Sequence, residues 1–186
     1  MREAWLIRHA ETEWTKSRQH TGVTDIPLTE AGREAARALA PRLAGHEFAL
    51  VLVSPLSRAR VTAELAGFGN VAQVREELRE WDYGDYEGVT TQDIRAKRPG
   101  WYLWRDGAPN GETADDVGAR VDPVIAEIDA VDGDVAIFAH GHLLRALGAR
   151  WVGEHASFGG RLALDPGTIS RLGYEREVRV LRAWNG

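Results

Sequence analysis

The segment Leu6-Ile7-Arg8-His9-Ala10-Glu11-Thr12 joins an apolar run to a charged pair, and the architecture of the chain can be worked out from it. Its apolar part, Ala4-Trp5-Leu6-Ile7, has no polar alternation, which is typical of a strand buried on both faces. Arg8 and His9 stand at the carboxyl end of this strand. A loop rich in Thr, Ser and Gly is expected next, over residues 10–27.

Strand and helix patterns alternate along the rest of the chain. Thr29 is expected to cap a helix with Ala35, Leu39 and Leu43 on one stripe, kinked by Pro41. Strands are expected at 48–53, 71–74 and 134–139, helices at 56–66, 113–129 and 142–152, and a closing hairpin at 168–172 and 178–181. Thr113 and Asp116 resemble a capping box.

This alternation predicts an α/β fold, a three-layer α/β/α sandwich with a mostly parallel sheet. We expect residues 1–186 to form one domain. Residues 81–112, named the lid segment below, have weak periodicity and six aromatic side chains, and we expect them to form a lid or pocket wall.

Composition excludes several functions. The chain has 186 residues, no cysteine and a formal net charge of −5. Disulfides, thiol catalysis and thiolate zinc sites are therefore excluded, and partnership with nucleic acid or an acidic membrane is not expected. No run of 18 apolar residues occurs, and the charged start of the chain does not resemble a signal peptide, so we expect a cytoplasmic protein. A homodimer is compatible with the sequence.

Charged side chains converge on one edge of the expected sheet. Ligands bind outside the carboxyl ends of the strands in open α/β sheets. The residues that follow those ends are Arg8, His9, Arg58, Glu80 and His140. Taken singly, each could be a surface charge or a hydrogen-bonded core group. Their joint arrival at one edge favours a functional site.

This set of groups suits phosphoryl transfer. Arginine matches phosphate oxygens bidentately, and a neutral imidazole can attack phosphorus. A second, protonated imidazole can stabilise the charge on the phosphoryl oxygens, and a carboxyl group can protonate the leaving oxygen. With two arginines and a protonated histidine supplying positive charge, we expect neither a metal nor a cofactor.

Several ordered motifs resemble those of the histidine phosphatase superfamily, whose fold is phosphoglycerate-mutase-like. The motifs are residues 6–12, the loop 21–29, the arginine segment 54–63 and the acid/base segment 78–88, followed by Ala139-His140-Gly141-His142. The resemblance extends over nearly the whole chain.

The resemblance implies a role for each residue. His9 would be the nucleophile and Glu80 the proton donor. Arg8, Arg58 and His140 would complete the catalytic phosphate pocket. The residues implied to contact substrate are Arg8, Thr21, Gly22, Arg58, Tyr83, His140 and Gly141. Two positions depart from the common pattern: Ala10 replaces a glycine, and Thr15 replaces an asparagine that contacts phosphate.

Within the family, residues 104–113 resemble a phosphatase subgroup that includes sedoheptulose-1,7-bisphosphatase and broad-specificity acid phosphatases. This implies a phosphatase acting on small sugar phosphates, with Lys16, Arg105 or Arg145 available for a second phosphate. The paired arginines and proline run of the mutases are missing between residues 89 and 112. A phosphoglycerate mutase nevertheless remains the alternative.

Two further readings stay open. The chain could bind a phosphate or phosphoprotein without turnover. A metallohydrolase using His140 and His142 is less favoured, because no carboxylate lies nearby at ligand spacing.

Overall fold

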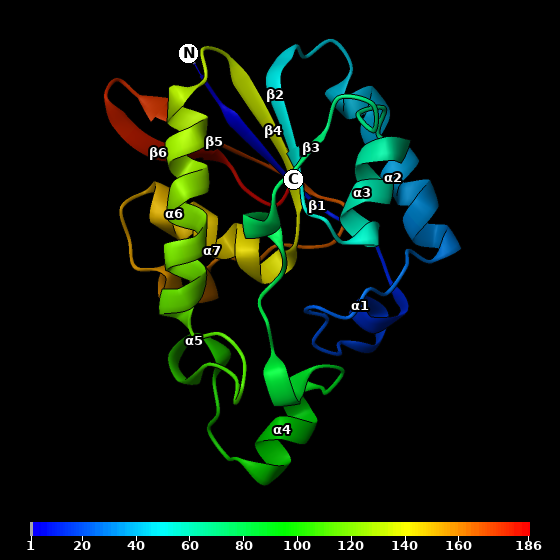
Figure 1. Cartoon of the computed structure of the whole chain (residues 1–186), viewed down its shortest axis with the longest axis vertical. Coiled ribbons are helices and arrows are strands. Elements are labelled where there is room, and N and C mark those ends of the chain that lie inside the picture. The colour runs from blue at the N-terminus through cyan, green and yellow to red at the C-terminus, as the bar shows by residue number, and fades with distance from the viewer. Residues whose placement is uncertain (1) are drawn as a thin grey trace.

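A six-stranded sheet lies between two layers of helices in the computed structural model, which describes residues 2–186 (Figure 1). The strand order is β3-β2-β4-β1-β5-β6. The strands are β1 (Ala4–Arg8), β2 (Phe48–Val53), β3 (Gln73–Val74), β4 (Asp134–Ala139), β5 (Ile169–Glu175) and β6 (Val178–Ala183). Strands β1 to β4 pair in parallel, whereas β5 and β6 add antiparallel. The predicted α/β sandwich is confirmed.

Helices cover both faces of this sheet. The α-helices are α1 (Glu13–Ser17), α2 (Glu30–Leu43), α3 (Ser57–Leu65), α4 (Thr91–Lys97), α5 (Leu103–Asp106), α6 (Ala114–Ala130) and α7 (Gly141–Trp151), and the 3₁₀ helices are η1 (Glu76–Leu78), η2 (Gly84–Tyr86) and η3 (Ala156–Arg161). Helices α2 and α3 pack on one face, and α6 and α7 on the other.

The apolar run of β1 is explained by these two layers. Ala4 and Leu6 belong to the core cluster on the side of α6 and α7, whereas Trp5 and Ile7 belong to the cluster on the side of α2 and α3. Successive side chains of a strand point to opposite faces, so a strand buried on both faces must be apolar throughout.

The buried face of α2 differs from the prediction at one residue. Thr29 caps the helix and accepts a hydrogen bond from the Gly32 amide, as expected. The buried side chains are Ala36, Leu39 and Leu43, whereas Ala35 is exposed. Positions 36, 39 and 43 follow the helical repeat, and residue 35 lies one position off that face.

Other boundaries differ in small ways. Helix α1 lies inside the segment expected to be a loop; it has five residues, none of them buried, and so leaves no apolar periodicity in the sequence. The third strand is confined to Gln73–Val74 at the edge of the sheet. The capping box of Thr113 and Asp116 at α6 and the closing hairpin are confirmed.

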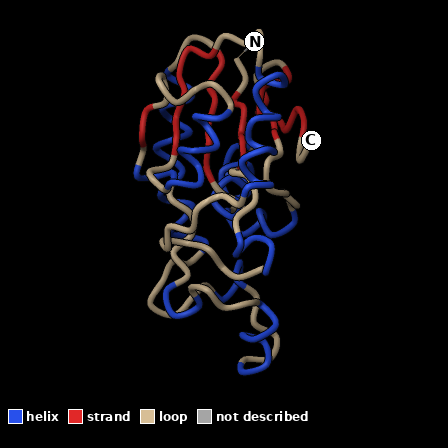
Figure 2. The backbone as a smooth tube through the Cα atoms, turned by 90° about the vertical axis from the view of Figure 1, so that its right-hand side faces the viewer, coloured by secondary structure: helices blue, strands red, loops and turns tan. Residues whose placement is uncertain are grey.

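The lid segment lies beyond the carboxyl ends of the parallel strands, where Figure 2 shows loops and short helices below the strands. It contains η2, α4 and α5. Four of its aromatic side chains, Trp81, Tyr83, Trp101 and Trp104, are buried. These side chains belong to the same core cluster as the side of the sheet covered by α6 and α7, so the lid segment is packed onto the main core. Among residues 2–186, no helix has the length and apolar character that crossing a bilayer requires.

Phe138 allows the core to be tested. Its ring is fully buried on β4 and packs against Phe68 at 5.7 Å between centroids. We predict that Phe138→Ala lowers the free energy of unfolding by about 3–5 kcal/mol, because it removes buried apolar area and leaves a cavity. Urea unfolding measures this. The exposed Val178→Ala should change the value by less than about 0.5 kcal/mol. A loss below about 1 kcal/mol for Phe138→Ala would contradict the described core.

Candidate active site

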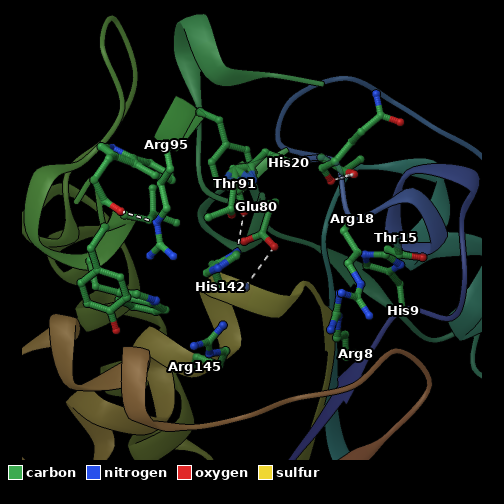
Figure 3. A pocket seen from close by; sticks show the side chains of 17 residues that line it. Arg8, His9, Thr15, Arg18, His20, Glu80, Thr91, Arg95, His142 and Arg145 are labelled. Carbon is green, nitrogen blue, oxygen red and sulfur yellow. Dashed lines mark hydrogen bonds between the residues drawn. The ribbon is translucent and has the colours of Figure 1, made fainter. Parts of the chain in front are cut away.

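Three neighbouring strands deliver polar residues to one edge of the sheet. Strand β1 is followed by His9, β4 by His140 and β2 by Ser54. Because β2, β4 and β1 are adjacent and parallel, these residues lie together. The His9 and His140 rings are 5.1 Å apart between centroids. A cavity of about 440 Å³ opens beside His9 (Figure 3).

The tautomer of His9 follows from one hydrogen bond. Its Nδ1 lies 2.7 Å from the carbonyl oxygen of Ala10. A carbonyl can only accept, so Nδ1 carries the proton and donates it. In a neutral ring the lone pair is then on Nε2. The Ala10 carbonyl thus prepares Nε2 as a nucleophile.

The surroundings of His9 keep the ring neutral. Burial lowers the pKa of His9 well below its usual 6.5, and the positive charges of Arg58 and Arg8 lower it further. The unprotonated, nucleophilic form therefore predominates at neutral pH.

Arg8 brings an uncompensated charge to the cavity wall. Its Nη1 donates to the Leu164 carbonyl, while its buried Nε has no hydrogen-bond partner within the described chain. Burial lowers its pKa. Gly141 makes room for it, since a Cβ there would lie 3.0 Å from the Arg8 Cζ. In residues 2–186, Arg8 forms no ion pair with a carboxylate. An anionic ligand would satisfy this group.

Arg58 lies behind the cavity wall, fully buried. It donates to the carbonyls of Thr21, Gly22 and Thr24 at 2.7–3.1 Å. Its Nε donates to His140 Nδ1 at 3.2 Å. Arg58 holds the loop and adds positive potential, and its direct contact with phosphate stays a prediction.

His140 is neutral, in contrast to the protonated imidazole expected from the sequence. Its Nδ1 accepts from Arg58, so its proton is on Nε2, which lies 2.6 Å from Ser54 Oγ. Burial lowers the pKa of His140 well below its usual value, and the charge of Arg58 lowers it further. Both ring nitrogens are occupied by protein groups, which disfavours the metallohydrolase reading.

The loop 21–24 also differs from expectation. The Gly22 amide, expected to contact phosphate, donates to Glu87 Oε1 at 2.8 Å, and Thr21 Oγ1 donates to the Gln19 carbonyl. Gly22 is pressed against the lid segment, where a Cβ would meet the Trp81 carbonyl oxygen at 2.4 Å. Thr21 still lines the cavity, but Gly22 does not.

Glu80 lies at the N-terminus of α7 and lines the cavity. Its carboxylate accepts hydrogen bonds from the amides of Trp81, His142 and Leu143 at 2.9–3.0 Å. These contacts fix the position of both carboxylate oxygens. A carboxyl group held in the same cavity as the nucleophile can serve as a general acid and base.

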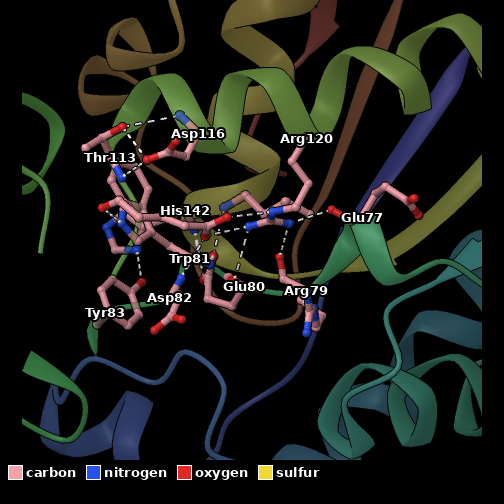
Figure 4. A network of polar contacts seen from close by, with 12 residues as sticks. Glu77, Arg79, Glu80, Trp81, Asp82, Tyr83, Thr113, Asp116, Arg120 and His142 are labelled. Atoms are coloured by element: carbon pink, nitrogen blue, oxygen red, sulfur yellow. Dashed lines mark hydrogen bonds and ion pairs between the residues drawn. The ribbon is translucent and has the colours of Figure 1, made fainter. Parts of the chain in front are cut away.

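A second layer of contacts holds the backbone around Glu80 (Figure 4). Arg120 on α6 donates to the carbonyls of Glu77 and Arg79, and it pairs with Glu112 at 2.8 Å. The segment carrying Glu80 is therefore tied to both α6 and α7.

The far wall of the cavity contains basic residues that the sequence analysis did not assign. Arg95 lines it together with Arg145, which was one of three candidates for a second phosphate contact. Arg18 lines the cavity on the side of His9 and Arg8 (Figure 3). Arg18, Arg95 and Arg145 form no ion pair with a carboxylate within the part of the chain that the structure describes. The other candidates, Lys16 and Arg105, do not line the cavity.

The sequence contains little that would identify Arg18 and Arg95 as cavity residues. Arg18 follows α1 in a left-handed conformation, and Arg95 is one of several basic residues near the end of α4. Neither position stands out by spacing. Figure 3 shows Arg95 and Arg145 on the side opposite Arg8 and His9.

Known proteins match this chain in sequence over most of its length. The family model of the histidine phosphatase superfamily (branch 1) matches residues 4–186. The chain is 40% identical over 181 residues to an acid phosphatase of Mycobacterium tuberculosis, covering 95% of this chain and 88% of the relative. It is 36% identical to the sedoheptulose 1,7-bisphosphatase of Saccharomyces cerevisiae, covering 80% and 66%.

Solved structures are similar over the whole chain. A structure of a Mycobacterium tuberculosis open reading frame matches with a TM-score of 0.93 and 38% identity, covering 99% of this chain and 97% of that one. A mycobacterial glucosyl-3-phosphoglycerate phosphatase in complex with VO₃ matches with a TM-score of 0.89 and 32% identity, covering all of both chains.

The buried histidines predict an acid-sensitive fold. Burial lowers the pKa of His20 to about 4, whereas an unfolded histidine titrates near 6.5. As the pH falls from 6.5 to 4, the unfolded state binds a proton that the folded state does not, so the folded state loses stability. Between pH 7.5 and pH 4.5, the free energy of unfolding should fall in both proteins. We predict that the fall is about 2 kcal/mol smaller in His20→Gln than in the wild type. Urea unfolding at both pH values measures this, and equal losses in the two proteins would contradict it.

Proposed function

The chain belongs to the histidine phosphatase superfamily and is a hydrolase of phosphate monoesters, and we propose that it hydrolyses small sugar phosphates through a phosphohistidine on His9, without a metal. The observation that carries this proposal is the hydrogen bond from His9 Nδ1 to the Ala10 carbonyl. It leaves the Nε2 lone pair of a neutral ring available beside a positively charged wall.

In the first proposed step, His9 Nε2 attacks phosphorus and the bond to the leaving oxygen breaks. Protonated Glu80 gives its proton to that oxygen, so the substrate leaves as an alcohol. In the second step, water attacks the phosphohistidine while Glu80 takes one of its protons. The bond from Nε2 to phosphorus breaks, inorganic phosphate leaves, and both residues return to their starting state.

In this proposal, the arginines stabilise the negative charge of the phosphoryl group. The phosphoryl group carries charge on its three non-transferred oxygens, and positioned positive groups stabilise that charge. Arg8 has an unpartnered Nε at the cavity, and Arg58 adds charge from behind the wall. The removal of the Arg8 guanidinium should lower the rate by about 10²–10³, as for oxyanion donors.

The far wall supports a substrate with a second anionic group, such as a sugar bisphosphate. Arg95 and Arg145 line the cavity opposite His9, and the lid aromatics Trp101 and Tyr102 line it as well. A cavity of about 440 Å³ is within the range of small-ligand sites. The similar yeast protein is a bisphosphatase.

A phosphoglycerate mutase remains the second candidate. A mutase of Brucella anthropi is 37% identical over 162 residues, covering 76% of this chain and 77% of the relative. In a mutase, His9 would return the phosphoryl group to a substrate oxygen instead of to water. Incubation with 2,3-bisphosphoglycerate and 3-phosphoglycerate separates the two activities: free phosphate supports the phosphatase, and net isomer formation supports the mutase.

We predict that His9→Ala abolishes phosphatase activity and the acid-labile phosphoenzyme, because His9 is the residue that accepts the phosphoryl group in the proposed mechanism. Rapid quenching with radiolabelled substrate measures both. His46→Ala is a matched control, since His46 is exposed and precedes β2, at the opposite edge of the sheet. Activity of His9→Ala close to that of the wild type would contradict the proposal.

We predict that Arg145→Gln lowers kcat/KM for fructose 1,6-bisphosphate about 10–100-fold and lowers kcat/KM for fructose 6-phosphate much less. The reason is that only the bisphosphate has a second phosphate with which Arg145 can form a charge-assisted hydrogen bond. Steady-state phosphate release measures the ratio. Arg105→Gln is the control, because Arg105 pairs with Asp106 away from the cavity. Equal losses for both substrates would contradict a second phosphate site.

A further inference from the structure

His142 has a ring nitrogen that is not explained by the fold. The ring lines the cavity near the Trp104 and Tyr83 rings, at 5.5 and 5.7 Å between centroids. Figure 3 shows it between Glu80 and Arg145. Its Nδ1 lies 2.6 Å from the Tyr83 hydroxyl (Figure 4), whereas Nε2 has no hydrogen-bond partner within residues 2–186.

The direction of the Tyr83–His142 hydrogen bond can be deduced. Tyr83 is almost fully buried, and its hydroxyl has no other partner in the described part of the chain. If His142 Nδ1 donated to Tyr83, the buried hydroxyl proton would have no acceptor, at a cost of about 1–3 kcal/mol. If Tyr83 donates, the hydroxyl proton and Nδ1 are both satisfied, and only the Nε2–H lacks an acceptor within the described chain. Tyr83 is therefore the donor, and the single proton of a neutral His142 is on Nε2.

The electrostatics agree with this assignment. Burial lowers the pKa of His142 well below its usual value, and the nearby charge of Arg145 lowers it further. Burial also raises the pKa of Tyr83, so its hydroxyl keeps its proton. Both groups are neutral at physiological pH.

The position of His142 is tied to that of Glu80. The His142 backbone amide donates to Glu80 Oε2 at 3.0 Å. Glu80 protonates the leaving oxygen in the function proposed above. His142 therefore lines the cavity next to Glu80, where the carbon skeleton beside that oxygen would lie.

We propose that His142 is a substrate-binding residue whose Nε2–H donates to an oxygen on the carbon skeleton beside the leaving oxygen, and that Tyr83 is a positioning residue that fixes this tautomer. The inference rests on the proposed function for the placement of the substrate. It gives Tyr83 a different role from the direct substrate contact predicted from the sequence. It also selects the substrate class: a phosphate ester with a neighbouring hydroxyl, carbonyl or ether oxygen.

The tautomer of His142 can be determined without an activity assay. Nitrogen-15 NMR of histidine-labelled protein separates protonated from unprotonated ring nitrogens, and comparison with His142→Gln assigns the His142 signals. We expect a protonated Nε2 and an unprotonated Nδ1, and a loss of this fixed pattern in Tyr83→Phe. A protonated Nδ1 in the wild type, or an unchanged pattern in Tyr83→Phe, would overturn the inference.

Substrate selection is tested with glycerol 3-phosphate and propyl phosphate, which differ only in two hydroxyl groups. We expect His142→Leu to lower the kcat/KM ratio of the first to the second about tenfold, the usual effect of one hydrogen bond. His142→Gln places an amide N–H near the position of Nε2 and should restore part of the ratio. If His142 had only a structural role, His142→Leu would lower kcat/KM equally for both substrates. An unchanged ratio would therefore overturn the inference.

The two proposals fail in different ways. If wild-type protein hydrolyses neither ester and no sugar phosphate, the proposed function fails, and the NMR result still decides the tautomer. If wild-type protein is active but His142→Leu leaves the ratio unchanged, the inference about His142 fails and the proposed function stands.

Discussion

The hydrogen bond from His9 Nδ1 to the Ala10 carbonyl is the interaction on which the chemistry of this site depends. It turns an ordinary imidazole into one whose Nε2 lone pair faces the cavity. The fold maintains that arrangement: β1 and β4 place His9 beside His140, and burial beside two arginines keeps the ring neutral. Without that carbonyl, the two tautomers would compete and the nucleophilic atom would not be defined.

The second constraint is the concentration of positive charge at one edge of an acidic protein. The chain has a net charge of −5, yet Arg8, Arg18, Arg95 and Arg145 all line one cavity. Cavities with low-dielectric walls focus such a field on an anionic substrate. The buried carboxylate of Glu80 lies in this field, where two amides at the N-terminus of α7 and the Trp81 amide hold it. Charge and position together fit the hydrolysis of a small, strongly anionic ester.

Much of the fold and part of the candidate site could be predicted from the sequence, because apolar runs locate buried strands and parallel strands bring their carboxyl ends together. That reasoning predicted His9 and Glu80 as site residues, and both line the cavity. It could not predict side-chain direction: Arg58 donates to His140 behind the wall, and the Gly22 amide donates to Glu87. Arg18 and Arg95 were missed because single arginines on short helices carry no pattern. Hydrogen-bond partners and tautomers are set by tertiary contacts that spacing does not encode.

The most direct test of the account is the identity of the nitrogen that carries phosphorus. Phosphoenzyme trapped by rapid mixing of nitrogen-15-labelled protein with substrate can be examined by NMR for coupling between phosphorus and each ring nitrogen of His9. The account predicts a bond to Nε2, with Nδ1 still protonated against the Ala10 carbonyl. A bond to Nδ1, or phosphorus on any other residue, would contradict it.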